Sequence, residues 1–147
     1  MEHVPFVLSG GGARAIAHLG VLQAFHEAGI GPSAISATSA GSLIGAFIAA
    51  GLTPMEASAL LHQEWQLHRT RWKLLRGELL TQRRIGEFLE KYLPVKYFED
   101  LRVPLYVSAT DLEHGGQRIF SAGEIIPPVL AACAGTPREG QDGTWIV

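Results

Sequence analysis

The chain has 147 residues, 47% of them hydrophobic and 18% charged, so it can bury one core and does not have the composition of a disordered protein. Twelve basic residues against 14 acidic ones give a formal net charge of −2, which gives no support to a nucleic-acid partner. The single cysteine, Cys133, cannot form an internal disulfide and fits a reducing compartment such as the cytoplasm.

The first half of the chain alternates short apolar runs with helical patterns. Residues 4–8 and 35–38 are apolar segments followed by small residues, and each predicts a short strand. The spacing of apolar residues predicts three helices, at 13–25, 42–50 and 53–68. Gly29 and Gly51 are the expected stops of the first two helices. Thr53-Pro54-Met55-Glu56 has the form of a capping box that opens the third.

The second half continues the same alternation. It predicts a helix at 81–92, a strand at 105–109, a turn at 113–116, a strand at 118–120, a helix at 124–133 and the start of a strand at 144–147. No repeat divides the chain, so we expect a single domain over residues 1–147. Short apolar strands alternating with helices predict an α/β sandwich with a mainly parallel central sheet.

Membrane-spanning and targeting segments are not predicted. The segment before the first apolar run is too short for a secretory signal, and that run breaks at Ser9 and the glycines after it. The longest apolar stretch, 43–52, is far short of the roughly 20 residues that span a bilayer. We expect a soluble, cytoplasmic protein that can still be peripheral at a membrane surface.

A glycine-rich loop follows the first predicted strand. Gly10, Gly11 and Gly12 precede a helix, so their backbone N–H groups form a site for a phosphate or a developing oxyanion, or simply a tight turn. Gly10-x-Gly12-x-x-Ala15 also fits a dinucleotide fingerprint, but the nearest acid, Glu27, falls inside a predicted helix and not at a strand end. No Gly-Lys-Ser or Gly-Lys-Thr follows, which excludes a P-loop.

A second small-residue turn follows the second predicted strand. A nucleophile elbow needs small residues two positions before and after its serine, and Ala37 and Gly41 stand at those positions around Ser39. The alternative is that Ser39 merely caps the following helix. In a parallel sheet the glycine loop and this elbow lie at the same carboxyl edge, which favours a nucleophile beside an oxyanion site.

The two segments resemble the G-G-G-x-R-G loop and the G-T-S-A-G elbow of the patatin-like phospholipases. The resemblance continues through residues 17–22, 98–101, 109–112 and 131–134 and covers nearly the whole chain. Ala15 and Ala37 stand where the family has glycine, and each adds one methyl group to a crowded turn. The resemblance implies a three-layer α/β fold and hydrolysis of lipid acyl esters by a Ser–Asp dyad without histidine.

Carried over by position, Ser39 is the nucleophile and Gly10, Gly11 and Gly12 form the oxyanion loop, with Arg14 as the basic residue of that motif. Arg14 can equally be a solvated helix residue or an ion-pair partner. No cofactor is implied, and the histidines and Cys133 show no metal-ligand spacing.

The dyad aspartate is the weakest part of the pattern. Asp142-Gly143 is the one Asp-Gly pair, but the polar residues 138–141 before it do not form a buried strand that could deliver a carboxylate. In the family the aspartate follows a strand such as 145–147, which would place it directly after Val147. We therefore expect either that Asp142 serves or that the C-terminal part of the domain is truncated or shortened. The alternative function is a catalytically impaired binding or scaffold domain with the same fold.

The middle of the chain combines aromatic and basic residues. The group comprises Trp65, Arg69, Arg71, Trp72 and Lys73. Tryptophan beside cations suits an anionic membrane interface, although the same pattern also fits a connecting segment whose rings pack on the core. The expected substrate is a phospholipid or another acyl ester. The sequence does not indicate an oligomeric state.

Overall fold

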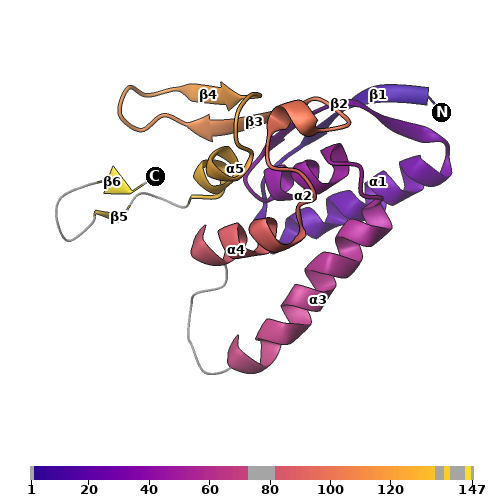
Figure 1. Ribbon diagram of the computed structural model, residues 1–147, viewed down its shortest axis with the longest axis horizontal. Coiled ribbons are helices and arrows are strands. Elements are labelled where there is room, and N and C mark those ends of the chain that lie inside the picture. Colours follow the sequence, from indigo (N-terminus) through magenta and orange to yellow (C-terminus); the bar gives the residue numbers. More distant parts are fainter. Residues whose placement is uncertain (1, 73–81, 135–137, 140–144, 147) are drawn as a thin grey trace.

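The computed structural model describes residues 2–72, 82–134, 138–139 and 145–146, and only the backbone of 65–72, 138–139 and 145–146. The elements are β1 (Glu2–Leu8), the 3₁₀ helix η1 (Gly12–Ile16), α1 (Ala17–Glu27), β2 (Ile30–Thr38), α2 (Ala40–Ala49), α3 (Pro54–Trp72), α4 (Gln82–Tyr92), the 3₁₀ helix η2 (Phe98–Asp100), β3 (Leu105–Thr110), β4 (Gln117–Phe120), α5 (Ile126–Cys133), β5 (Arg138–Glu139) and β6 (Trp145–Ile146) (Figure 1).

The central sheet has the order β1-β2-β3-β4, with the first three strands parallel and β4 antiparallel to β3. This confirms the α/β class with a mainly parallel sheet. Strand β2 begins at Ile30, five residues before the predicted start. Gly31 and Pro32 are poor strand formers, so the local pattern did not indicate a strand there, but pairing with β1 holds them extended. The register shifts between Val4 and Pro5. Val4 pairs with Pro32 at this point, and Pro32 has no backbone N–H to donate to the ladder.

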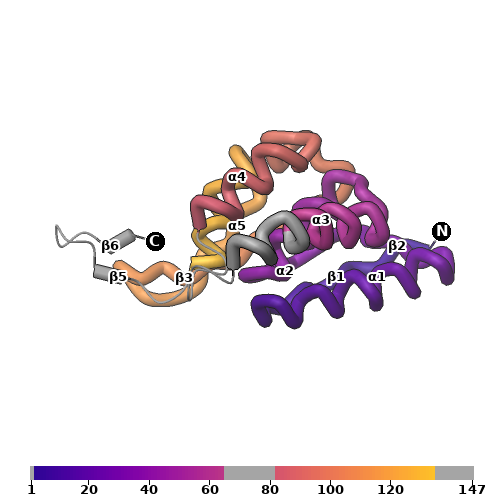
Figure 2. Tube along the Cα trace, turned by 90° about the horizontal axis from the view of Figure 1, so that it is seen from below, coloured from indigo at the N-terminus to yellow at the C-terminus, as the bar shows by residue number. Residues whose placement is uncertain are grey.

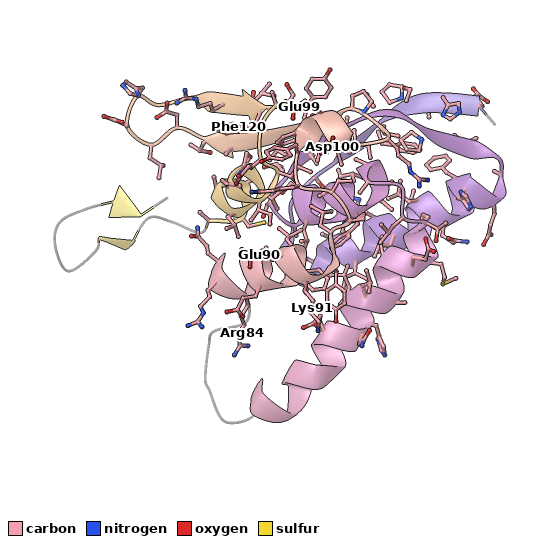
Figure 3. All side chains as sticks on the ribbon, in the orientation of Figure 1. Arg84, Glu90, Lys91, Glu99, Asp100 and Phe120 are labelled. Atoms are coloured by element: carbon pink, nitrogen blue, oxygen red, sulfur yellow. The ribbon has the colours of Figure 1, made fainter. Side chains whose placement is uncertain are left out.

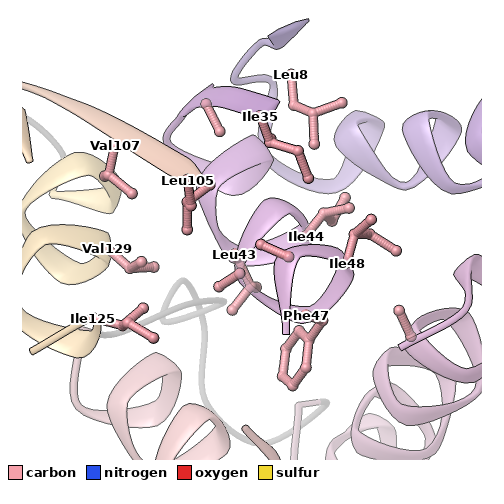
Figure 4. Close-up of a cluster of buried hydrophobic side chains, with 14 of the residues drawn as sticks. Leu8, Ile35, Leu43, Ile44, Phe47, Ile48, Leu105, Val107, Ile125 and Val129 are labelled. Carbon is pink, nitrogen blue, oxygen red and sulfur yellow. The ribbon is translucent and has the colours of Figure 1, made fainter. Parts of the chain in front are cut away.

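The core lies between the sheet and the helices, which lie on one side of it (Figure 1 and Figure 2). Helices α1, α2 and α5 pack against this face of the sheet, α3 packs on α1 and α2, and α4 packs on α5. Ile35 and Val107 are fully buried on this face, and Phe47 is fully buried on the side of α2 away from the sheet (Figure 4). The Phe47 ring lies edge-on to Phe88 of α4 at 5.3 Å between ring centroids. Because parallel crossovers are right-handed, connections that step in one direction across a sheet place their helices on the same face. The strand order therefore explains why the helices of the two parallel connections, α1 and α2 to α4, share one side.

The opposite face of the sheet is open in the described part of the chain. Val7 is 79% exposed, Tyr106 43% and Ile119 58%. Val7 and Tyr106 both pair with Ser36, so they form one row across three strands. The described residues therefore supply two of the three layers that the resemblance implies.

The helix ends follow local signals. Thr53 Oγ1 accepts the N–H of Glu56 at 3.2 Å, and the Glu56 carboxylate accepts the N–H of Thr53 at 2.8 Å, which confirms the capping box. Gly29 lies just after α1 with a φ of 75°, as a glycine stop requires. Helix α3 runs to Trp72, beyond the predicted end near residue 68. It is tied to α4 by Lys91, whose Nζ donates to Glu64 Oε1 at 3.3 Å (Figure 3).

The segment before β3 has a structural part. Phe98 is buried, and its N–H donates to the carbonyl of Gly123. The Glu99 carboxylate accepts the N–H of Gly123 at 2.9 Å, which lowers its pKa below the ordinary value (Figure 3). These contacts join η2 to the turn after β4.

The C-terminal strand prediction is confirmed for residues 145–146, but its pairing was not foreseen. Trp145–Ile146 pairs antiparallel with Arg138–Glu139 in a separate two-stranded sheet. Two antiparallel strands can be joined by a short turn, whereas adding β6 to the sheet as a parallel strand would need a long crossover connection.

Candidate active site

Ser39 occupies the turn between β2 and α2 with φ 51° and ψ −135°. It is the one non-glycine residue with positive φ in the described part of the chain, and such a conformation costs about 1–3 kcal/mol. Ser39 stands at the N-cap of α2, but its side chain makes no capping hydrogen bond. The conformation matches a nucleophile elbow and argues against the alternative of a capping serine.

The residues around Ser39 are small because the backbones of α2 and of the end of β1 come into close contact there. A Cβ atom added to Gly41 would lie 2.4 Å from the carbonyl oxygen of Leu8 and 2.6 Å from that of Ser9. The first turn of α2 therefore packs directly on the end of β1. The methyl group of Ala37 is buried and faces Gly45 of α2. A Cβ atom added to Gly45 would lie 3.3 Å from the Ala37 Cβ, so the glycine on the helix leaves room for the Ala37 methyl group.

The glycine loop lies against Ser39. A Cβ atom added to Gly10 would lie 2.9 Å from Ser39 Cβ and 3.5 Å from Ser39 Oγ. Gly11 and Gly12 have φ values of 152° and 57°, which favour glycine. Among the described residues, neither the Gly10 nor the Gly11 N–H has an acceptor. The structure thus brings together the predicted loop and the predicted serine, at the carboxyl edge of the parallel strands.

The family profile described as patatin-like phospholipase matches residues 6–137. The chain belongs to the patatin-like phospholipase family. The resemblance of the loop and the elbow to this family is therefore confirmed, and residues 6–137 include both segments.

Similar proteins include the lysophospholipase NTE1 of Cryptococcus neoformans, 27% identical over 83% of this chain, and the neuropathy target esterase sws of Drosophila melanogaster, 31% identical over 83%. This chain spans 8% and 9% of their respective lengths. The structure of ExoU, in its heterodimeric complex with SpcU from the type III secretion system of Pseudomonas aeruginosa, aligns with a TM-score of 0.59 at 18% identity. That alignment covers 88% of this chain and 36% of the other, and it shows the fold alone.

Ser42 supports the turn at Ser39 in this patatin-like domain, although it lies outside the predicted motifs. Its side chain is fully buried, and its hydroxyl donates to the Ser39 carbonyl at 2.6 Å, beside its own backbone N–H at 2.8 Å. The available signal was a lone polar residue in the first turn of a strongly apolar helix. Cys133 of α5 contacts Ser42, and burial raises the pKa of its thiol while the Ser42 hydrogen bond opposes that rise.

Arg14 is exposed in η1, and its backbone N–H donates to the Gly11 carbonyl at 3.2 Å. Its guanidinium forms no ion pair with any residue whose side chain is described. Glu27 ends α1 and accepts a hydrogen bond from Gln23, so no acid stands at the strand position that a dinucleotide fingerprint needs.

The predicted partner of Ser39 is not placed. Asp142 lies outside the described residues. Within residues 2–64 and 82–134, no carboxylate or imidazole is hydrogen-bonded to Ser39 Oγ. The same ranges contain no cluster of three or more potential metal ligands. No helix in the described part of the chain is long and apolar enough to cross a membrane.

Asp111 follows β3 and organises the turn after it. Its Oδ1 accepts the N–H groups of Glu113 and His114, both at 3.1 Å. A cleft of about 210 Å³ opens beside it, lined also by Arg118 and Phe120. A larger cleft of about 330 Å³, beside Gly51, lies at the other end of α2 and so away from Ser39.

The hydrogen bonds to Asp111 predict a pH dependence. The His114 N–H, followed by that of Glu113, lowers the pKa of Asp111 below its ordinary value. Its stabilising contribution is therefore complete above the ordinary aspartate pKa and lost as the pH falls through the lowered folded value. We expect Asp111→Asn to weaken the fall in urea stability between about pH 5 and pH 2. Identical pH profiles for the two proteins would contradict this.

Proposed function

We propose that this chain hydrolyses lipid acyl esters, as a phospholipase A or esterase, with Ser39 as the nucleophile. The observation that carries the proposal is Ser39 itself, strained at φ 51° with the backbone of Gly10 against its side chain. An elbow of this kind exposes the serine Oγ to a substrate. The contact of the Gly10 backbone with the Ser39 side chain supports the N–H groups of Gly10, Gly11 and Gly12 as the donors to an oxyanion.

In the proposed reaction Ser39 Oγ attacks the ester carbonyl carbon and its proton passes to a carboxylate, for which Asp142 is the candidate in this chain. The carbonyl oxygen becomes an oxyanion that the glycine loop stabilises. The tetrahedral intermediate collapses, and the alcohol leaves with a proton. Water then attacks the acyl-serine ester and releases the fatty acid, which regenerates the Ser39 hydroxyl. No cofactor takes part.

The names of the relatives support an acyl-ester substrate, since one is a lysophospholipase and another an esterase. The test is to incubate the purified chain with lysophosphatidylcholine and with phosphatidylcholine and to measure the released fatty acid. A fluorophosphonate probe should label the same protein once, and labelling should block the release. Labelling without release would instead support the impaired binding or scaffold domain. A folded chain that neither labels nor releases fatty acid would contradict the proposal.

We also propose that the group Trp65, Arg69, Arg71, Trp72 and Lys73 contacts an anionic membrane. The first four belong to the C-terminal part of α3, and Lys73 lies outside the described residues. Each Lys or Arg near such a surface contributes about 1 kcal/mol. Changing Arg69, Arg71 and Lys73 to glutamate should therefore lower binding to phosphatidylserine vesicles by at least about tenfold. Binding to neutral phosphatidylcholine vesicles is the control, and unchanged binding to the anionic vesicles would contradict this prediction.

A further inference from the structure

We infer that His18 is a positioning residue for the glycine loop: it holds the Ser9 carbonyl and thereby sets the direction of the Gly10 N–H. This inference rests on the proposed function for its consequence in catalysis. The geometry of the inference is independent of the proposed function, because the contact joins His18 of α1 to the loop at Ser9.

The contact itself is a single hydrogen bond across the loop. His18 lies in the first turn of α1, and its Nε2 is 3.0 Å from the carbonyl oxygen of Ser9. A carbonyl oxygen can only accept, so Nε2 carries the hydrogen in this contact. A nitrogen that donates to a carbonyl is not free to take the Ser39 proton, which argues for positioning and against a role as general base.

Peptide geometry carries the effect of His18 to Gly10. The bond between Ser9 and Gly10 is trans, and in a planar trans peptide the C=O and the following N–H point in opposite directions. Holding the Ser9 oxygen toward α1 therefore turns the Gly10 N–H to the opposite side. That N–H has no acceptor among the described residues, and the Gly10 backbone contacts the Ser39 side chain.

The loop has few other contacts that could fix the orientation of the Ser9–Gly10 peptide. On one side the Ser9 oxygen faces Gly41, where an added Cβ would lie 2.6 Å away, and on the other it meets His18. Between β1 and η1, the one other hydrogen bond found in the described residues joins the Arg14 N–H to the Gly11 carbonyl. Glycines rotate freely, so without His18 the Ser9–Gly10 peptide can turn.

The experiment compares His18→Ala with His18→Gln in the 147-residue chain. A glutamine amide places an N–H donor at about the distance of Nε2, so it should restore the bond. His26→Ala is the matched control, because His26 is an exposed histidine in the last turn of the same helix and its side chain makes none of the hydrogen bonds found in the described residues. All three variants are first checked for native circular dichroism and urea stability.

Two readouts are measured. We expect His18→Ala to slow phosphonylation of Ser39 and to lower kcat for a soluble ester by about 10- to 100-fold with little change in KM, because loss of one oxyanion donor costs about 10²–10³ in kcat. His18→Gln should recover to within about threefold of the original rate. The amide resonances of Gly10 and Gly11 should shift in His18→Ala and stay in place in His26→Ala.

The two readouts separate failure of the inference from failure of the proposed function. If the original chain labels at Ser39 but folded His18→Ala labels at the same rate, the inference is wrong and the proposed function stands. If the original chain does not label, the proposed function fails, and the Gly10 amide alone decides. A shift confined to His18→Ala then supports the positioning role, and unchanged resonances overturn it.

Discussion

We expect Ser39→Ala to remove fluorophosphonate labelling and fatty-acid release completely and to leave the stability of the fold nearly unchanged. In the proposed reaction Ser39 Oγ is the attacking atom, and it makes no hydrogen bond in the described residues that the substitution could remove. Ser39→Gly should have the same effect on activity and should also raise the free energy of unfolding by about 1 kcal/mol. Glycine adopts the φ of 51° without the steric strain that serine and alanine carry there.

The measurement combines probe labelling, fatty-acid release and urea unfolding on the three proteins. The pair of variants separates chemistry from strain, because both lose the hydroxyl and one alone relieves the backbone. Residual labelling of Ser39→Ala at the original rate would place the nucleophile elsewhere. A Ser39→Gly protein less stable than Ser39→Ala would show that the elbow is not strained.

We expect Gly41→Ala to destabilise the fold by about 3 kcal/mol or more, well above the effect of most single substitutions. The added methyl group would lie 2.4 Å from the Leu8 oxygen and 2.6 Å from the Ser9 oxygen. Both neighbours are backbone atoms at the end of β1, so neither can move aside by changing a rotamer. Separating α2 from β1 would also displace the glycine loop from Ser39.

Gly20→Ala is the matched control for Gly41→Ala. Gly20 lies exposed inside α1, and nothing stands within 4 Å of an added Cβ. Alanine should therefore stabilise the chain by about 0.5–1 kcal/mol through helix propensity. Urea unfolding checks both variants. Equal stabilities for Gly41→Ala and the original chain would show that α2 does not pack on β1 as described.

The elements could be predicted where their signals are local. The capping box at Thr53 and Glu56 needs four consecutive residues, and the hydrogen bonds between them are present. The start of β2 was missed because Gly31 and Pro32 are extended through pairing with β1, which no local pattern records. The partner of β6 was missed for a different reason: Arg138–Glu139 lies nearby in the sequence, but its polar residues did not indicate a strand.

The candidate site divides in the same way. Gly10 and Ser39 were found because each lies in a short motif whose residue types carry the chemistry, and their meeting followed from two parallel strands ending at one edge. The contacts of Ser42 and His18 were not predicted. Both side chains bond backbone carbonyls, and the position of a backbone carbonyl depends on the geometry of its loop and not on residue type.

The family, the alternation of strands and helices, and the serine and glycines of the candidate site could be read from the sequence, because they depend on residue type and on spacing over a few positions. Tertiary structure alone decided the strain at Ser39, the contact of Gly41 with β1, the bond from His18 to Ser9 and the open face of the sheet. Each of these depends on how close separate segments come in space. That distance is set by packing of the whole core, so no local pattern encodes it.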